Sequence, residues 1–561
     1  MKKIYGICLL LLFFGLLFSI RQFTRESNTT LLDETIPEMV GQQEVIIENE
    51  PYKSPLDDPY PAPSLPTEAD SYPAPEAETD PYPAPTSSNV TLLSNRGDEV
   101  ETKESLSLNT TPESEQDQST TSASEQTYQY FMPFMTSSIQ KKGNTIFGVQ
   151  VSPGRGSIVA SKAKEANVSW VRYNGFGWSD VEPKRGEYNW DALAEFESDL
   201  DQLIGQGETP MVVIRSTPEW AQKIPGVYCG QMKPEAFQDF ANFMSAMVKR
   251  YSGRPFDVQY WEIGNEPDID PSQIHPREPF GCWGDQNDEF YGGGYYAEML
   301  KVVYPAIKEA NPRAKVILGG LVLDCDPTAP PEGKDCHSSR FFEGVLRQGG
   351  GDFFDIAAYH IYPFWQSNII DPDLMSEAWQ HRGGLLVGKL NYMRELMAQY
   401  QVRKPIIMNE GALICHKSNK ACPSDSFFDR QANYLHRFYA RGWANGLEGM
   451  IWYTLGPGGW LQGGLLDEAG NPRPSYTALT FLSQLLGNAI PNGQLSAGEL
   501  EGYSFKDEHS EIQLYWSNSE QIHTIPLPLY THAVYNKLGE PLPQSKFLEI
   551  STEPIYIQIV K

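Results

Sequence analysis

Residues 258–267, Val-Gln-Tyr-Trp-Glu-Ile-Gly-Asn-Glu-Pro, form a short strand-like run that stops abruptly at a glutamate, Glu266. A second apolar run, Pro-Ile-Ile-Met-Asn-Glu-Gly at 405–411, ends in the same way at Glu410. A glutamate in this position lies at the end of a strand rather than on the solvated face of a helix. We therefore expect the two carboxylates, which are far apart in the sequence, to converge at one end of a sheet or barrel.

The region around these runs, residues 143–490, alternates short β-branched or apolar runs with helix-like stretches of mixed charge. Eight strands alternating with helices predict an α/β protein with a (β/α)8 TIM barrel. The expected strands span 146–151, 170–173, 210–215, 258–263, 315–319, 355–360, 405–409 and 450–453. The expected helices include 191–206, 234–251, 295–310 and 428–445.

A doubly wound open sheet is the main alternative to the barrel. Such a sheet normally carries a glycine-rich phosphate-binding loop directly after its first strand. The corresponding residues here, Val-Ser-Pro-Gly-Arg-Gly at 151–156, match that loop poorly. The pattern therefore favours the barrel. Residues 491–561 switch to short alternating strands at 513–516, 533–535 and 555–560, which predict a small C-terminal β-sandwich.

The amino terminus, residues 1–21, predicts a membrane anchor. Lys2 and Lys3 precede an uncharged apolar run, residues 4–20, that ends at Arg21. This run is 17 residues long, at the short end of the roughly 17–25 residues that span a bilayer as a helix. No small-residue cleavage site follows it, so an uncleaved signal anchor is favoured over a cleaved secretory signal. In either case we expect the rest of the chain to be exported, membrane-anchored or secreted.

Residues 22–142 are rich in Pro, Ser, Thr and Glu and repeat Tyr-Pro-Ala-Pro at Tyr60, Tyr72 and Tyr82. Residues 26–140 hold 22 Asp and Glu against 3 Lys and Arg, a net −19, so the rest carries only −9 of the total −28. This composition predicts a disordered, extended linker, with a docking tract for a proline-binding module as the alternative. The acidic balance also argues against nucleic acid as a partner.

Six cysteines lie outside the apolar amino-terminal run. An even number in an exported protein indicates disulfides. Two pairs are close in sequence, Cys325 with Cys336 and Cys415 with Cys422, which leaves Cys229 to pair with Cys282 across two loops. Zinc is the competing interpretation, but the chain has no Cys-x-x-Cys unit, and we expect no metal.

The carboxyl ends of the barrel strands line the active site in this fold. The residues expected there are Arg172, Trp220, Asn265, Glu266, His360, Tyr362, Glu410 and Trp452. Two facing carboxylates, one protonated and one ionised, are the minimum equipment for hydrolysing a glycosidic bond, and no cofactor is needed. We expect Asn265 to bind a sugar hydroxyl, Tyr362 to hold the ionised carboxylate and Trp452 to stack on a sugar ring. Each residue also has a purely structural alternative, as a salt-bridge partner or a core aromatic.

Residues 147–486 resemble the clan A retaining glycoside hydrolases, of the family 39 and family 5 type. The strings that carry the resemblance are 261–267, 408–411, 170–172, Trp178 with Glu182, Pro183 and Gly186, 218–220, and Tyr-His-Ile-Tyr-Pro at 359–363. In that clan the fourth-strand Asn-Glu is the general acid/base and the seventh-strand glutamate is the nucleophile. The resemblance therefore implies that Glu266 is the acid/base and Glu410 the nucleophile.

The chain departs from that clan in the long loops 271–294, 323–339 and 416–426, where the predicted disulfides fall. We expect a retaining glycosidase that acts on an extracellular β-linked carbohydrate such as a xyloside, glucoside or mannoside, with an α-arabinosidic or other equatorially linked sugar as the alternative. Two alternatives are a non-catalytic carbohydrate-binding protein on a barrel scaffold and a transglycosylase using the same residues. The C-terminal region is also compatible with a carbohydrate-binding module, although few of its aromatics stand out.

Overall fold

The computed structural model describes residues 145–560 except 152, 154–155, 276–277 and 279. The expected membrane anchor and linker, residues 1–142, lie outside the described residues. Within the described part of the chain, no helix combines the length and the apolar character that crossing a membrane requires.

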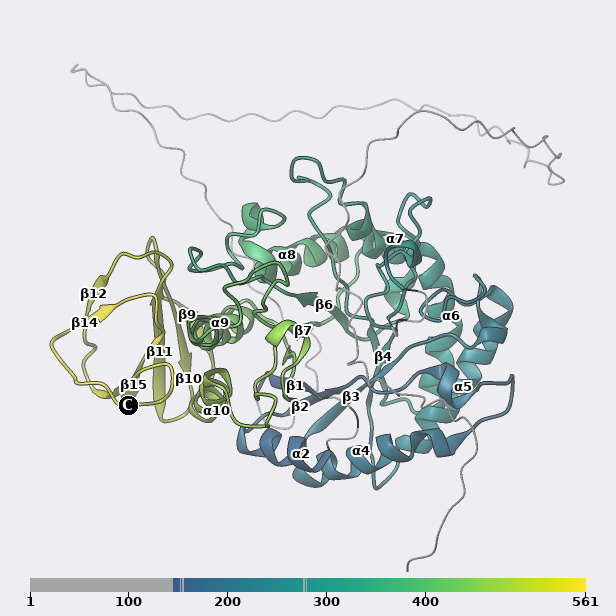
Figure 1. Cartoon of the computed structure of the whole chain (residues 1–561), viewed down its shortest axis with the longest axis horizontal. Coiled ribbons are helices and arrows are strands. Elements are labelled where there is room, and N and C mark those ends of the chain that lie inside the picture. The colour runs from purple at the N-terminus through teal and green to yellow at the C-terminus, as the bar shows by residue number, and fades with distance from the viewer. Residues whose placement is uncertain (1–144, 152, 154–155, 276–277, 279, 561) are drawn as a thin grey trace, which may run out of the picture. The chain divides into compact units, whose positions relative to one another are not determined.

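Eight parallel strands form the central barrel (Figure 1). Their bounds are β1 Phe147–Val151, β2 Trp170–Tyr173, β3 Thr209–Ile214, β4 Tyr260–Ile263, β5 Lys315–Leu318, β6 Ala357–Ile361, β7 Ile406–Gly411 and β8 Met450–Trp452. The hydrogen-bonded order runs β5-β4-β3-β2-β1-β8-β7-β6. Backbone bonds from the Leu318 amide to Ile356 (2.9 Å) and from Leu321 to Ala358 (3.1 Å) join β5 to β6. The barrel prediction is confirmed, and every strand end lies within two residues of its predicted position.

Helices surround the strands in the alternating order that the sequence predicts (Figure 1). Their bounds are α2 Gly156–Glu165, α3 Trp178–Val181, α4 Ala194–Gln206, α5 Phe237–Tyr251, α6 Gly293–Ala310, α7 Phe341–Arg347, α8 Gly384–Gln399, α9 Asp425–Ala444 and α10 Pro474–Leu486. Their apolar faces pack on the outward-facing strand residues and form the main hydrophobic core.

The barrel interior is filled by a separate apolar cluster. Its members are Trp170, Met211, Tyr260, Ile317, Ile356, Ala358, Ile407 and Ile451. Because side chains alternate along a strand, residues two positions further on also point inward, one rung nearer the carboxyl ends. That next rung holds Arg172, Glu262 and His360, which are all buried. The interior therefore changes from apolar to charged at the mouth of the barrel.

Three disulfides tie down loops of the barrel: Cys229–Cys282, Cys325–Cys336 and Cys415–Cys422. All three pairings agree with the sequence prediction. The first links the loops that follow β3 and β4, and the other two close short loops after β5 and β7.

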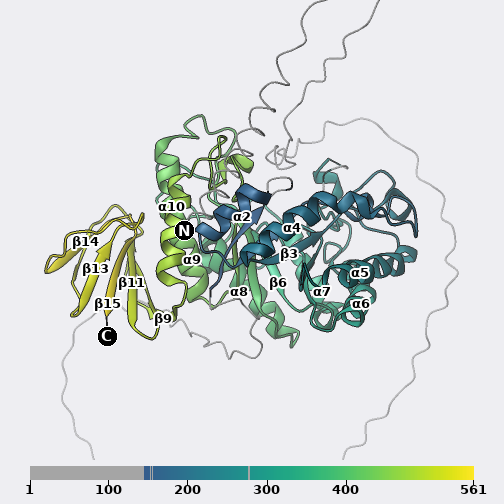
Figure 2. The same ribbon diagram turned by 90° about the horizontal axis from the view of Figure 1, so that it is seen from below.

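An antiparallel β domain follows the barrel and lies beside α9 and α10 (Figure 2). Its strands are β9 Ile490–Gln494, β10 Leu500–Lys506, β11 Ser510–Ser517, β12 His523–Pro526, β13 Thr531–Tyr535, β14 Phe547–Ile550 and β15 Ile555–Val560. Five of them form a sheet in the order β13-β15-β11-β10-β9, and β12 pairs with β14. Phe505, Leu514 and Trp516 on one face join the main barrel core. Tyr515 and Ile557 instead cluster with Ile550 of β14, which gives the domain a small core of its own.

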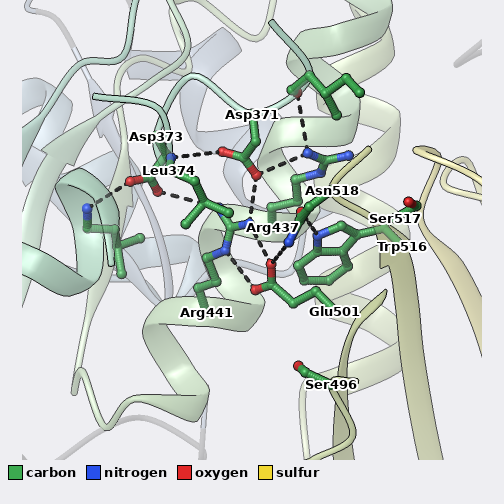
Figure 3. Close-up of polar contacts among 12 residues, drawn as sticks. Asp371, Asp373, Leu374, Arg437, Arg441, Ser496, Glu501, Trp516, Ser517 and Asn518 are labelled. Atoms are coloured by element: carbon green, nitrogen blue, oxygen red, sulfur yellow. Dashed lines mark hydrogen bonds and ion pairs between the residues drawn. The ribbon is translucent and has the colours of Figure 1, made fainter. Parts of the chain in front are cut away.

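A buried ion network fastens the β domain to the barrel (Figure 3). Arg441 of α9 donates to Asp371 (2.6 Å), in the loop after β6, and to both oxygens of Glu501 on β10 (2.7 and 2.8 Å). Arg437 donates to Asp371 (3.0 Å), and both guanidinium groups lie about 5.8 Å or less from the ring of Trp516. Although burial opposes ionisation, Arg441 holds the pKa of Glu501 below its ordinary value. The network is therefore charged and almost free of water contact.

The network predicts a large loss of stability in Glu501→Ala. Removing one partner leaves buried positive charge on Arg441 without its bidentate carboxylate, and such losses typically amount to about 3 kcal/mol or more. Glu187→Ala is a matched control, because Glu187 pairs with Lys184 at 3.7 Å on the solvent-exposed surface and should change the free energy of unfolding little. Urea denaturation of the two variants makes the comparison, and equal losses would contradict a stabilising role for the network.

Candidate active site

Arg172 is the centre of the polar cluster at the barrel mouth. It points inward from β2 and is 0% exposed. Its guanidinium donates to Glu262 of β4 through two bonds of 2.8 Å and to the side-chain oxygen Oδ1 of Asn265 at 2.6 Å. It also donates to Gln150 of β1 and to Glu410 of β7. An arginine has five N–H donors, and here all five have an acceptor.

Glu410 is held at both oxygens. One accepts from Arg172 and the other from the hydroxyl of Tyr362. The register of β7 shifts against β6 between Tyr359 and His360, and against β8 between Met408 and Gly411. A bulge of this kind re-aims side chains, which explains how Glu410 faces the mouth although it directly follows the inward-pointing position of Asn409. Two charge-assisted donors stabilise a negative charge on this carboxylate.

Glu266 lies just beyond β4 in an unusual backbone conformation. Gly264 has φ +81°, which glycine adopts freely, and Glu266 itself has φ +54°. A non-glycine residue in this region is strained, and such strain persists where the surroundings fix it, often at functional sites. The Glu266 amide donates to the Gly320 carbonyl at 3.0 Å, and its carboxyl contacts His360 Nδ1 at 2.8 Å.

The pKa of Glu266 is raised to about 7. Burial is the largest cause, because a carboxylate loses its hydration there, and Glu262 adds repulsion; Arg172 and Lys389 act in the opposite direction. Burial likewise lowers the pKa of His360 to about 4, so its imidazole is neutral near pH 7. Glu266 can therefore hold or release a proton at neutral pH.

The two glutamates face one another across the mouth. One oxygen of each and a ring nitrogen of His360 all lie within 4.8 Å of one another. Among the described residues, these three also form a cluster whose ligand atoms are close enough together to hold a metal ion. Each oxygen of Glu410 already accepts one hydrogen bond, from Arg172 or Tyr362, so a cation there would share this carboxylate with those donors and would lie close to the positive charge of Arg172.

Several buried polar atoms at the mouth have no hydrogen-bond partner among the described residues. They are Glu266 Oε2, His360 Nε2 and both amide atoms of Asn409. The space next to His360 is limited by Gly320, because a Cβ there would lie 2.0 Å from Nε2. Gly320 also lies close to Asn409 Oδ1. Buried polar groups are normally satisfied, so Glu266 Oε2 is the atom of this set best suited to a hydroxyl group of a ligand.

The predicted site residues fall into two groups. Arg172, Asn265, Glu266, His360, Tyr362 and Glu410 meet in one hydrogen-bonded cluster. Trp220 does not join it: its indole nitrogen donates to the Glu182 carbonyl at 3.0 Å and its ring packs on Trp178.

The prediction for Trp452 as a sugar-stacking surface is wrong. Its neighbour Ile451 points into the barrel, so alternation turns Trp452 outward. The ring is 0% exposed and packs on Phe438 of α9 at 5.3 Å. Tyr453 and Trp460, both half-buried, lie instead against Tyr362, with ring centroids 6.0 and 5.2 Å away.

The sequence interpretation missed Glu262, Gln150 and Lys389. Glu262 lies inside an apolar run, and only the alternation with Tyr260 signals that it points inward. Lys389 of α8 is 5% exposed and donates to the carbonyls of Val322 (2.6 Å) and His360 (3.0 Å). A lysine in a helix is usually assigned to the solvated face, so no local pattern indicates that Lys389 is buried beside the barrel mouth.

No protein-family model and no curated protein matches this sequence. Solved structures do share its fold. A family 39 glycoside hydrolase from the gut symbiont Bacteroides cellulosilyticus WH2 is 21% identical, with a TM-score of 0.56 over 76% of this chain and 82% of the other. A conserved exported protein from Bacteroides fragilis is 13% identical, with a TM-score of 0.54 over 75% and 98%. A family 30 endoxylanase from Clostridium papyrosolvens C71 is 10% identical, with a TM-score of 0.50 over 75% and 97%.

The chain thus shares its fold with solved structures that include two glycoside hydrolases. At these identities the similarities establish the barrel architecture expected from the resemblance to clan A. The roles of the individual residues rest on the geometry of this chain.

Replacing Lys389 with methionine should raise the pKa of Glu266 further, because the ammonium group is one of the two cations that lower it. The measurement is a pH titration of the glutamate carboxyl resonances by ¹³C NMR, with Glu266→Gln to assign the signal. Lys301→Met is the control, since Lys301 pairs with Glu298 on the surface of α6. A Glu266 titration that is the same in both lysine variants would contradict this electrostatic contribution.

Proposed function

We propose that this protein is a retaining glycosidase in which Glu266 is the general acid/base and Glu410 is the nucleophile. The proposal rests on one observation: the two close carboxylates have different surroundings. Glu410 accepts from Arg172 and Tyr362, whereas burial raises the pKa of Glu266 to about 7. Two close carboxylates, one held by fixed donors at both oxygens and one that keeps a proton to near neutral pH, are the usual mark of a nucleophile and an acid.

The spacing of the carboxylates favours retention of configuration. Oxygens within 4.8 Å suit the separation of about 5–5.5 Å between carboxyl groups in retaining enzymes, whereas inverting enzymes need roughly 6.5–9.5 Å to admit a water. Glu410 is therefore close enough to attack the sugar directly.

In the first step, protonated Glu266 donates its proton to the glycosidic oxygen while Glu410 Oε attacks the anomeric carbon. The bond to the leaving sugar breaks, and a covalent glycosyl–Glu410 ester forms. Arg172 and Tyr362 neutralise charge on Glu410 before the attack and stabilise its departure afterwards. Asn265, fixed by Arg172 at 2.6 Å, is placed to bind a hydroxyl of the reacting sugar.

In the second step, ionised Glu266 accepts a proton from water, and the resulting hydroxide equivalent attacks the anomeric carbon. Glu410 leaves as a carboxylate, and Glu266 is protonated again for the next cycle. The neutral imidazole of His360 at 2.8 Å keeps the Glu266 carboxyl aimed at the mouth in both protonation states.

The substrate we propose is an extracellular neutral oligo- or polysaccharide, such as a xyloside, glucoside or mannoside. Three disulfides are typical of proteins from oxidising compartments outside the cytosol. An exported enzyme of this kind meets its substrate at or beyond the cell surface, held there by the amino-terminal segment or released.

The central test is covalent labelling with a panel of 2-deoxy-2-fluoro glycosides of xylose, glucose and mannose. We expect one of them to inactivate the protein and to add its mass to the peptide that contains Glu410. Glu410→Gln should neither turn over substrate nor become labelled. A protein that binds oligosaccharides but shows neither turnover nor an adduct would be a binding protein, and the proposal would be wrong.

The pH dependence of kcat/KM should show a basic limb near pH 7. The acid must be protonated in the free enzyme, so activity falls as pH rises through the pKa of Glu266, which is about 7. In Glu266→Gln the limb should disappear, and glycosides with activated aryl leaving groups should retain more activity than unactivated ones. A basic limb that persists in this variant would assign the proton to another group.

A further inference from the structure

A cavity of about 500 Å³ lies between the loops that follow β6 and β7. Its lining includes Phe364, Gln366, Asn368, His416 and Asn419. Phe364 is 39% exposed, one of the few large apolar side chains exposed to this degree among the described residues. Its ring meets His416 edge-on, with centroids 5.0 Å apart.

The cavity lies on the same rim as the two glutamates. The loops extend outward from the carboxyl ends of β6 and β7 side by side, since Phe364 pairs in parallel with Ile414. Phe364 comes two residues after Tyr362, which donates to Glu410, so their Cα atoms are at most about 7 Å apart. A chain bound at the glutamates can therefore reach the cavity.

The walls of the cavity are fixed in place. The Trp365 amide donates to Ile414 (2.9 Å) and the Asn419 side chain donates to the Trp365 carbonyl (3.1 Å), so the two loops hold each other. The disulfide Cys415–Cys422 closes the second loop. Near its middle the first loop is bonded to α9, where Arg430 donates to the Ile370 carbonyl at 2.9 Å. A preorganised cavity binds a ligand with little loss of conformational entropy.

The chemistry of the lining indicates a neutral ligand with many hydroxyl groups. It contains amide, hydroxyl and imidazole groups and an exposed aromatic ring, but no carboxylate, lysine or arginine. The contrast is a second cavity of about 600 Å³, lined by Asp335, Arg340 and Glu343, whose charges suit a different ligand. Amide and hydroxyl groups match sugar hydroxyls, and an aromatic ring matches the apolar C–H face of a pyranose.

We propose that the cavity between the β6 and β7 loops is a remote sugar subsite. It binds a neutral pyranose unit of the same chain whose linkage is cleaved between Glu266 and Glu410, and Phe364 is its main contact. This proposal rests on the proposed function and extends it: the protein acts on chains rather than on single glycosides. Binding energy from a remote unit orients the reacting bond and increases the rate on longer substrates.

The test measures binding apart from catalysis. The full chain carrying Glu410→Gln is run in native gels that contain arabinoxylan, mixed-linkage β-glucan, glucomannan or linear arabinan. At least one of the three polysaccharides built on pyranose units, arabinoxylan, β-glucan or glucomannan, should retard it, whereas linear arabinan, which consists of furanose units, should not. Adding Phe364→Ala should weaken the binding about tenfold, a loss on the scale of one aromatic contact. Phe364→Tyr, which keeps a stacking ring, should bind as the parent does.

Phe547→Ala is the matched control, because Phe547 is a 52% exposed phenylalanine on β14 of the C-terminal domain. It should leave the retardation unchanged. Loss of binding in Phe547→Ala but not in Phe364→Ala would place the binding on the β domain and overturn the proposal. Retardation by none of the three pyranose-based polysaccharides, or retardation that Phe364→Ala does not weaken, would also overturn it.

Kinetics separate this proposal from the proposed function. With Glu410 intact, the ratio of kcat/KM for the bound polysaccharide to kcat/KM for the matching aryl monoglycoside should fall about tenfold in Phe364→Ala. Turnover with an unchanged ratio would leave the glycosidase assignment standing and remove the subsite. Phe364-dependent binding without any turnover would keep the subsite and remove the glycosidase assignment.

Discussion

The barrel mouth depends on one buried charge, the guanidinium of Arg172. A fully buried cation is unfavourable unless each of its donors has an acceptor and its charge is compensated. Here the acceptors come from β1, β4 and β7, so satisfying one side chain brings together the residues of three strands. Two carboxylates, Glu262 and Glu410, form ion pairs with it within the barrel. The position of the candidate nucleophile thus follows from the need to satisfy this arginine.

The same arginine makes the two candidate catalytic glutamates different. It bonds directly to Glu410 but acts on Glu266 only through space, and there burial has the larger effect on the pKa. Glu262 accepts two parallel hydrogen bonds from the guanidinium and adds a negative charge next to Glu266. Glu262 therefore affects the proposed chemistry although it does not react. Without Glu262, two N–H donors of Arg172 would be available to Glu266, and Glu266 would lose its proton at a lower pH.

Much of this arrangement could be predicted from the sequence, because the periodicity of apolar residues and the residues that end a strand are local signals. The eight strands, the two glutamates and the short-range cysteine pairs all follow from residues near one another in the chain. The error at Trp452 came from treating a strand end as a single position, when alternation gives neighbouring residues opposite faces. Glu262 and Lys389 were missed because their surroundings are assembled from β2, β5 and β6, which no local pattern describes. Arg437 and Arg441 are a similar case, since a domain added later in the chain buries them.

The burial of those two arginines explains why the β domain is packed against the barrel rather than attached flexibly. The loop after β6 carries Tyr362 at its start and Asp371 near its middle. Asp371 is held by Arg437 and Arg441, and Arg441 is compensated on its other side by Glu501 of the β domain. If the β domain were absent, Arg441 would lose both of its bonds to Glu501 and would keep Asp371, at 2.6 Å, and Asp373, at 3.6 Å, as its partners. The loop would then be held less firmly, because part of the buried guanidinium would be left without an acceptor. The domain therefore contributes to the rigidity of a loop whose first residues touch the candidate nucleophile, although the domain itself supplies no side chain to the described cluster at the mouth.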